Sequence, residues 1–166
     1  MTLPFAALGA LIAALLEASL LPELPIAGTH ADLVLTLAIV ATMLLGPEDG
    51  LVWAFVGGLM LDMLTPARPI GATTLTLLLV VGLAALISHF AGRGHRLPAI
   101  LSVFAATWIF HLLLLGVLVL VEGVAFSVFE PRLVLAAALM NTLLAVPAAF
   151  VYSAIGRRLV TERADW

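Results

Sequence analysis

Acidic side chains at the ends of apolar segments are the residues of this sequence with the clearest capacity for chemistry. Glu17 and Asp62 each lie near the end of an apolar segment, and Asp32 immediately precedes another. A carboxylate in or beside hydrocarbon costs free energy unless it is compensated, so such an acid is a functional or structural candidate. Three other acids lie in connecting segments and are interpreted as solvated: Glu23, Glu122 and Glu130.

Asp62 continues a stripe of small residues at helical spacing, formed by Gly50, Ala54 and Gly58. This stripe predicts that Asp62 points into packed protein rather than lipid. An acid at a helix C-terminus is also disfavoured by the helix dipole, so the sequence predicts compensating groups. Arg68 is one candidate, but we favour the N–H groups around Gly71–Thr74 with the hydroxyl of Thr73 or Thr74. Asp62 is thus interpreted as a structural residue that holds the third and fourth spans together.

Other polar side chains within apolar segments do not form a catalytic pattern. His111 lies one turn from Thr107, and a lone histidine there is more often a packing residue than a ligand. The sequence has no HExxH, no GxSxG and no P-loop, so no metal or cofactor site is predicted. It has no cysteine, which excludes disulfides and thiolate chemistry. We expect a protein that is not an enzyme.

Composition places these residues in a membrane protein. Hydrophobic residues make up 64% of the 166 residues and charged residues 10%, far from the balance of a soluble domain. The net charge is -3 and no basic run occurs, which argues against nucleic-acid binding. The expected fold is all-α, a polytopic transmembrane helical bundle that forms a single domain over residues 1–166.

Charge-free stretches locate six predicted spans. They cover residues 1–16, 33–47, 50–61, 69–92, 97–121 and 133–156. The last three are long enough to cross about 30 Å of hydrocarbon. The first is long enough if Glu17 is accepted near its end, and a cleaved signal peptide is disfavoured because no Lys or Arg precedes it. The second and third are short and are joined at Gly46–Gly50, so a re-entrant pair is the alternative to two true spans.

The arginines predict the orientation. Five lie on one side of a six-span layout, at positions 93, 96, 157, 158 and 163, and two lie on the other, at 68 and 132. The positive-inside rule therefore places both termini in the cytoplasm.

Small residues also recur at helical spacing in the first and last spans. One stripe comprises Ala6, Ala10, Ala14 and Ala18, and the other comprises Ala137, Asn141, Ala145 and Ala149. Such faces let helix backbones approach closely in lipid. We expect at least one stripe to pack against a helix of this chain or of a partner, with Pro147 able to kink the last span.

The central block of the sequence resembles the MreD family of bacterial rod-shape-determining membrane proteins. The resemblance rests on four runs: His30-Ala31-Asp32-Leu33-Val34-Leu35, Gly46-Pro47-Glu48-Asp49-Gly50, Phe55-Val56-Gly57-Gly58-Leu59-Met60-Leu61-Asp62-Met63-Leu64 and Pro69-Ile70-Gly71-Ala72-Thr73-Thr74-Leu75. The family pattern is matched at Asp32, Leu33, Gly58, Asp62, Gly71 and Leu75. It is not matched at Ala31, where proline is usual, nor at Thr73, where histidine or asparagine is usual.

The resemblance implies a non-enzymatic part of the cell-elongation machinery in the bacterial cytoplasmic membrane. MreD-like proteins bind MreC, which has one span and an extracytoplasmic domain. Together they link MreB indirectly to the peptidoglycan synthase RodA and its penicillin-binding partner. The candidate residues are then Asp32, Gly58, Asp62, Gly71 and Thr73, with the two alanine-lined stripes as packing or partner faces.

A second function class remains open. The chain is similar in size and span count to the substrate-binding components of energy-coupling-factor vitamin transporters, which dock through an alanine-lined face of the first helix. A transporter component should also present a polar and aromatic pocket for its solute. The few aromatic residues, 8 Phe, 3 Trp and 1 Tyr, make this the alternative to the scaffold.

Overall fold

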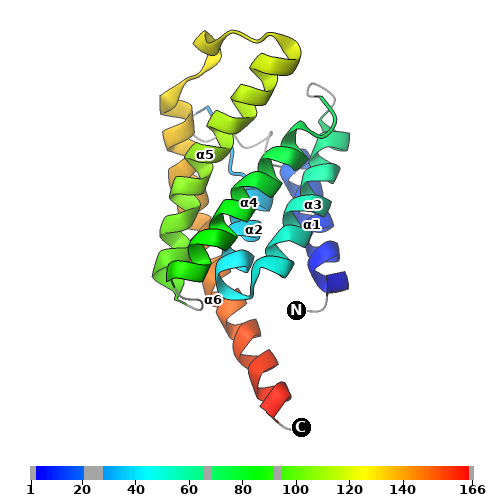
Figure 1. The fold of residues 1–166 in the computed structure, drawn as a ribbon, viewed down its shortest axis with the longest axis vertical. Coiled ribbons are helices and arrows are strands. Elements are labelled where there is room, and N and C mark those ends of the chain that lie inside the picture. Colours follow the sequence, from blue (N-terminus) through cyan, green and yellow to red (C-terminus); the bar gives the residue numbers. More distant parts are fainter. Residues whose placement is uncertain (1–2, 21–27, 66–68, 92–94, 165–166) are drawn as a thin grey trace.

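The fold is all-helical in the part of the chain that the computed structural model describes, residues 3–20, 28–65, 69–91 and 95–164 (Figure 1). Its helices are α1 (Leu3–Ser19), α2 (Leu33–Leu44), α3 (Pro47–Leu64), α4 (Ala72–Ala91), α5 (Arg96–Glu122), the short 3₁₀ helix η2 (Phe126–Val128) and α6 (Pro131–Ala164). The predicted all-α class is confirmed, and each predicted span corresponds to one α-helix.

The helix boundaries follow from local chemistry. Gly46 has φ of +141°, where other residues are strained, and Pro47 then occupies a first-turn position of α3. Glu48 and Asp49 follow in that first turn, where the helix dipole favours acids. Gly123 ends α5 in the left-handed region at φ of +67°, and its N–H donates to the carbonyl of Val119.

Three of the described helices are long and apolar enough to cross a membrane. The qualifying segments are Ala72–His89, Arg96–Glu122 and Pro131–Gly156. The shorter helices α1 and α2 have 17 and 12 residues, and α3 has 18 residues of which three are acidic. The helices α4, α5 and α6 therefore have the length and the apolar composition of membrane spans, as the sequence predicts. Six complete crossings remain a prediction.

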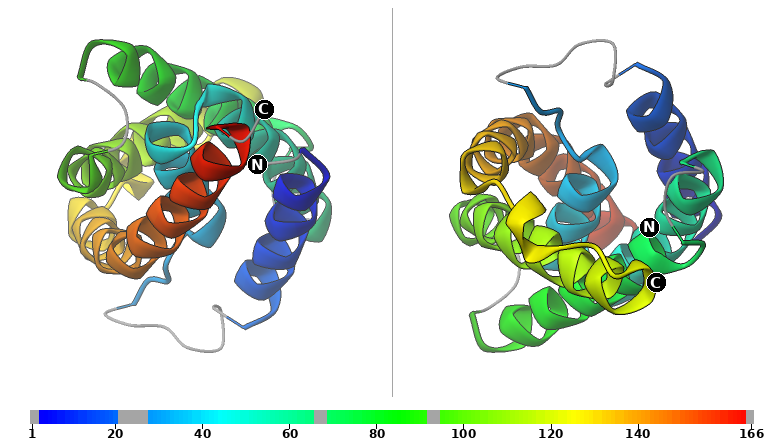
Figure 2. Two further views of the ribbon diagram at one scale, coloured as in Figure 1. Left: turned by 90° about the horizontal axis from the view of Figure 1, so that it is seen from below. Right: turned by 90° about the horizontal axis from the view of Figure 1, so that it is seen from above.

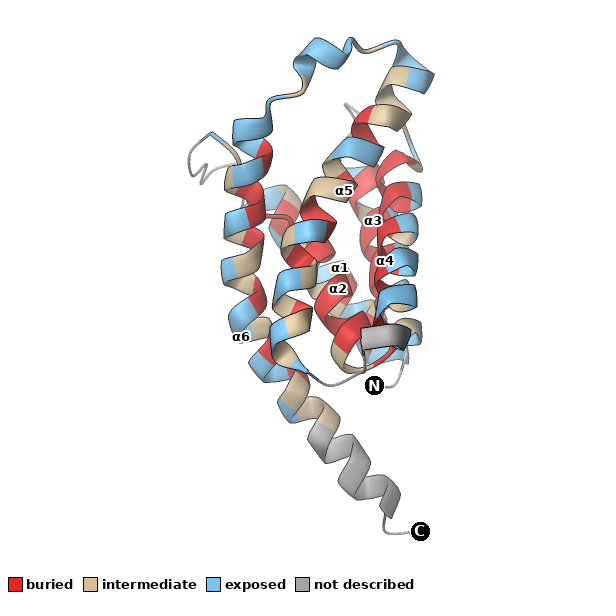
Figure 3. Ribbon diagram, turned by 60° about the vertical axis from the view of Figure 1, so that its left-hand side comes forward, coloured by how far each residue is buried: buried red, intermediate tan, exposed pale blue. Residues whose placement is uncertain are grey.

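Helix α2 lies at the centre of the bundle. It contacts all five other α-helices, which follow one another around it in the order α1, α3, α4, α5 and α6 (Figure 2). Most of its residues are buried, and the exposed residues of the bundle lie on the outward faces of the surrounding helices (Figure 3). Apolar side chains on those outward faces suit a lipid environment. The short α2 is covered by protein rather than lipid.

Glycines allow α3 to approach its neighbours closely. A Cβ added at Gly57 would meet Val34 of α2, and one added at Gly58 would lie 2.8 Å from Cα of Thr74 in α4. One added at Gly50 would meet the side chain of Thr42. The stripe of Gly50, Ala54 and Gly58 therefore packs within the chain, as its spacing predicts.

The two ends of the bundle differ. At one end α1 begins and α6 ends, and there Arg96 of α5 donates from Nε to Oγ of Ser153 at 2.8 Å (Figure 1). The guanidinium of Arg96 also stacks 4.3 Å from the ring centroid of Phe150. At the opposite end α1, α3 and α5 end while α2, α4 and α6 begin. We call this second end the pocket end, because the candidate site lies there.

Candidate functional site

Asp62 receives the N-terminus of α4. Its Oδ1 accepts the N–H of Thr73 at 2.9 Å, and its Oδ2 accepts the N–H groups of Gly71 and Thr74, each at 3.0 Å. The hydroxyl of Thr74 also donates to Oδ2 at 2.6 Å. The first N–H groups of a helix have no partner within the helix, so the carboxylate satisfies donors that would otherwise be left in an apolar region. This is the arrangement we favoured from the sequence. Arg68, the other candidate, lies outside the described residues.

Glu17 makes a similar contact at the start of α2. Its Oε2 accepts the N–H of Val34 at 2.8 Å, and the side chain is buried. An acid at the end of α1 therefore binds the N-terminus of α2, as an acid at the end of α3 binds the N-terminus of α4. In both cases the negative charge lies against the positive end of the next helix.

Asp32 joins three helices at the pocket end. Its N–H donates to Oδ1 of Asn141 at 2.8 Å, and the amide of Asn141 donates back to Oδ2 of Asp32 at 2.9 Å. That amide also donates to Oγ1 of Thr107 at 3.1 Å. Asp32, Asn141 and Thr107 are all buried, so this network connects the start of α2 to α5 and α6 without exposing polar groups to lipid.

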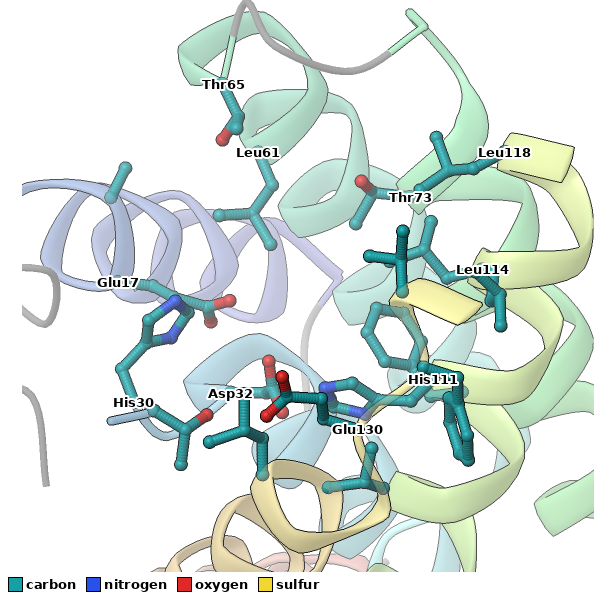
Figure 4. A pocket seen from close by; sticks show the side chains of 18 of the residues that line it. Glu17, His30, Asp32, Leu61, Thr65, Thr73, His111, Leu114, Leu118 and Glu130 are labelled. Carbon is teal, nitrogen blue, oxygen red and sulfur yellow. The ribbon is translucent and has the colours of Figure 1, made fainter. Parts of the chain in front are cut away.

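The carboxylates of Glu17 and Asp32, together with that of Glu130, line a pocket of about 580 Å³ (Figure 4). Its polar wall is formed by Glu17, Thr29, His30, Asp32, Thr65, Thr73, His111 and Glu130. Its apolar wall is formed mainly by Leu61, Leu64, Phe110, Leu114, Leu115, Leu118, Val128, Phe129, Leu133 and Val134. The pocket therefore combines a polar side with an aliphatic side, and its lining residues come from α1, α3, α4, α5, η2, α6 and the connecting segments.

Two imidazoles face this pocket. Nδ1 of His111 lies 2.9 Å from the carbonyl oxygen of Thr107, a contact that requires a donor, so we assign the proton of the neutral ring to Nδ1. Nε2 of His111 is then an acceptor. Nδ1 of His30 is buried and has no hydrogen-bond partner among the described residues. In Figure 4, the His111 ring lies beside Asp32 and Glu130, and the His30 ring lies near Glu17.

The candidate residues that the sequence resemblance suggests lie at this end of the bundle. Asp32 and Thr73 line the pocket directly. Three others support the pocket without being among its lining residues. Asp62 accepts hydrogen bonds from the start of α4, and Gly58 lets the backbone of Thr74 approach α3 closely. Gly71 has φ of +95° in the turn before α4. Since Thr73 presents its side chain to the pocket, its departure from the family pattern changes the pocket wall and not the bond from its N–H to Asp62.

Both alanine-lined stripes are packed within the chain. Ala6, Ala10 and Ala14 are fully buried, Ala18 is half-buried beside the pocket, and α1 packs mainly on α3. In the other stripe every member is fully buried, and α6 packs on α5 and α2: Ala137, Asn141, Ala145 and Ala149. Of the two alternatives left open by the sequence, packing within the chain is the one observed.

Sequence reasoning missed three polar pocket residues and undervalued a fourth. Thr29, His30 and Thr65 carried no expectation, and His111, which the sequence suggests is a packing residue, lines the pocket. Glu122 and Glu130 are exposed as predicted, but Glu130 also lines the pocket. Glu23 lies outside the described residues. The position of His30, two residues before Asp32 and just before α2, could have indicated that it lies at the same end of the bundle as Asp32.

No family model, curated protein or solved structure matches this chain.

Proposed function

We propose that this chain is a non-enzymatic, MreD-like scaffold of the bacterial cell-elongation machinery, and that it binds MreC at the pocket end. The observation that carries the proposal is the convergence just described. Asp32, Gly58, Asp62 and Gly71 match the family pattern at scattered positions, and all four build or support the same pocket. A pattern that arose only from abundant apolar residues would have no reason to converge in this way.

The predicted orientation gives the pocket a role. The positive-inside rule places both termini in the cytoplasm, so the pocket end faces the extracytoplasmic side, where MreC has its folded domain. The small-residue stripes are used inside the chain, whereas the pocket offers a concave surface for docking. RodA, its penicillin-binding partner and MreB are then reached through MreC rather than by direct contact.

Co-purification with MreC from the same source tests this function. Val128 and Phe126 both belong to η2 and are exposed at 64% and 67%, but Val128 lines the pocket and Phe126 is not among its lining residues. We expect Val128→Trp to reduce co-purification of MreC at least tenfold, because the indole ring is much larger than the valine side chain and takes up space in the pocket. Phe126→Trp is the matched control and should have little effect. Equal retention of MreC by both variants, or no retention by the unaltered chain, would contradict the proposal.

The pocket volume also favours a second candidate, a substrate-binding component of an energy-coupling-factor type of transporter. A cavity of about 580 Å³ is within the range of small-molecule sites. A solute bound to the purified protein, identified by mass spectrometry after denaturation, would support this candidate. Co-purification with MreC and no bound solute would support the scaffold.

A further inference from the structure

We propose that the pocket binds a cationic side chain, an arginine or a lysine, presented by the outer segment of the partner. This inference rests on the proposed function and specifies the chemistry of the same site. Three carboxylates line the pocket, those of Glu17, Asp32 and Glu130, and none of the described lining residues is an arginine or a lysine. The fixed charge of this described lining is therefore negative.

The carboxylate of Asp32 at the base of the pocket keeps capacity for a further donor. Oδ2 of Asp32 accepts the Asn141 amide, and Oε2 of Glu17 accepts the N–H of Val34. An ionised carboxylate offers about four acceptor sites, so the bond from Asn141 does not exhaust Asp32. These bonds also hold each carboxylate in place before a partner arrives, which reduces the ordering cost of binding.

The remaining polar wall is also suited to a donor. Because Nδ1 of His111 donates to the carbonyl of Thr107, Nε2 of the neutral ring presents a lone pair to the pocket. A guanidinium has five N–H donors and no acceptor, so it matches a wall that combines carboxylates with this imidazole nitrogen.

The aliphatic wall of the pocket suits the apolar methylene stem of an arginine or a lysine. Leu114 and Leu118 of α5 face the acids across the pocket and can contact the methylene stem and its apolar neighbours (Figure 4). The low dielectric of this setting strengthens attraction between unlike charges. A bare metal ion fits less well, because no group of three or more His, Asp or Glu among the described residues has a metal-binding arrangement.

A pair of peptides tests the charge requirement without the partner. The probes are acetyl-Leu-Arg-Leu-amide and the same peptide with citrulline, which keeps the shape of arginine but carries no charge. The full chain in nanodiscs is titrated with each, and the imidazole resonances of His30 and His111 report occupancy, with empty nanodiscs as the blank. We expect the arginine peptide to bind at least tenfold more tightly, and the difference to shrink at high salt.

Two acids provide a matched pair of variants. Glu130 lines the pocket, whereas Glu122 is an exposed acid at the end of α5 that is not among the lining residues. Glu130→Gln should reduce the preference for arginine at least threefold, and Glu122→Gln should leave it unchanged. Equal binding of both peptides to the unaltered chain, or equal effects of the two variants, would overturn the inference.

The two proposals can fail separately. If MreC co-purifies but the arginine peptide shows no advantage, the scaffold function stands and the cation chemistry is wrong. If the arginine preference is found but MreC does not co-purify, the pocket chemistry stands and the partner is wrong. If the peptide binds without shifting the resonances of His30 and His111, it binds outside the pocket, and the proposed binding site is wrong.

Discussion

At the scale of single residues, buried acids organise the pocket end. Glu17, Asp32 and Asp62 are each at least nine-tenths buried, and each accepts a hydrogen bond from a group on another helix. A buried charge is tolerated only when such partners are present, so these residues and their donors must be considered together.

Substitutions of Asp62 test this dependence. Asp62→Leu leaves the N–H groups at the start of α4 without an acceptor, and we expect a loss of about 2–3 kcal/mol in the free energy of unfolding. Asp62→Asn keeps one acceptor oxygen and should cost clearly less. Thermal unfolding in detergent measures both, with Glu122→Leu as the control for removing an exposed acid at a helix end. Equal losses for Asn and Leu would show that the charge, rather than hydrogen bonding, is what matters.

Asn141 gives an independent test. Asn141→Leu removes both bonds to Asp32 and should cost about 3 kcal/mol, since a buried carboxylate and an N–H are left unpaired. Thr142→Val is the matched control, because the Thr142 hydroxyl donates only to Ala138 within its own helix among the described contacts. A loss below about 0.5 kcal/mol for Asn141→Leu would mean that water replaces the amide.

At the scale of helices, the close approach of α3 and α4 depends on Gly58. A methyl group there would lie 2.8 Å from a backbone atom of Thr74, which cannot move aside as a flexible side chain can. We expect Gly58→Ala to destabilise the protein by about 1–3 kcal/mol. Gly82→Ala in α4 is the control, because nothing lies within 4 Å of its added Cβ, and there alanine should be neutral or stabilising. Equal stability of the two variants would show that α3 and α4 can separate at little cost.

At the scale of the whole molecule, the arrangement in the membrane is the prediction to test first. The chain has no cysteine, so single cysteines can be placed at will. Phe126→Cys at the pocket end should react with an impermeant thiol reagent in intact cells, and Arg158→Cys should react only after the membrane is opened. Labelling of position 158 from outside would reverse the orientation and place the pocket in the cytoplasm.

The sequence predicted the helices well and the pocket poorly, for different physical reasons. Helix positions follow from local hydrophobicity and from breakers such as Gly46-Pro47, and the Asp62 contact follows from short-range geometry. The bond between Asp32 and Asn141 joins residues 109 positions apart, and no local pattern announces it. His30 and Glu130 come together only because α1, α5 and α6 are placed around α2, an arrangement that depends on tertiary packing.

The separation of Asp32 and Asn141 has a consequence for biosynthesis. Helix α2 is synthesised before α6, which carries the Asn141 amide that pairs with Asp32. Until α6 is inserted, the start of α2 carries a carboxylate without that partner in a setting that penalises it. The pocket is therefore completed only when α6 has been inserted. A product truncated before α6 lacks this stabilising pair, which gives membrane quality control a physical basis for distinguishing it from the finished protein.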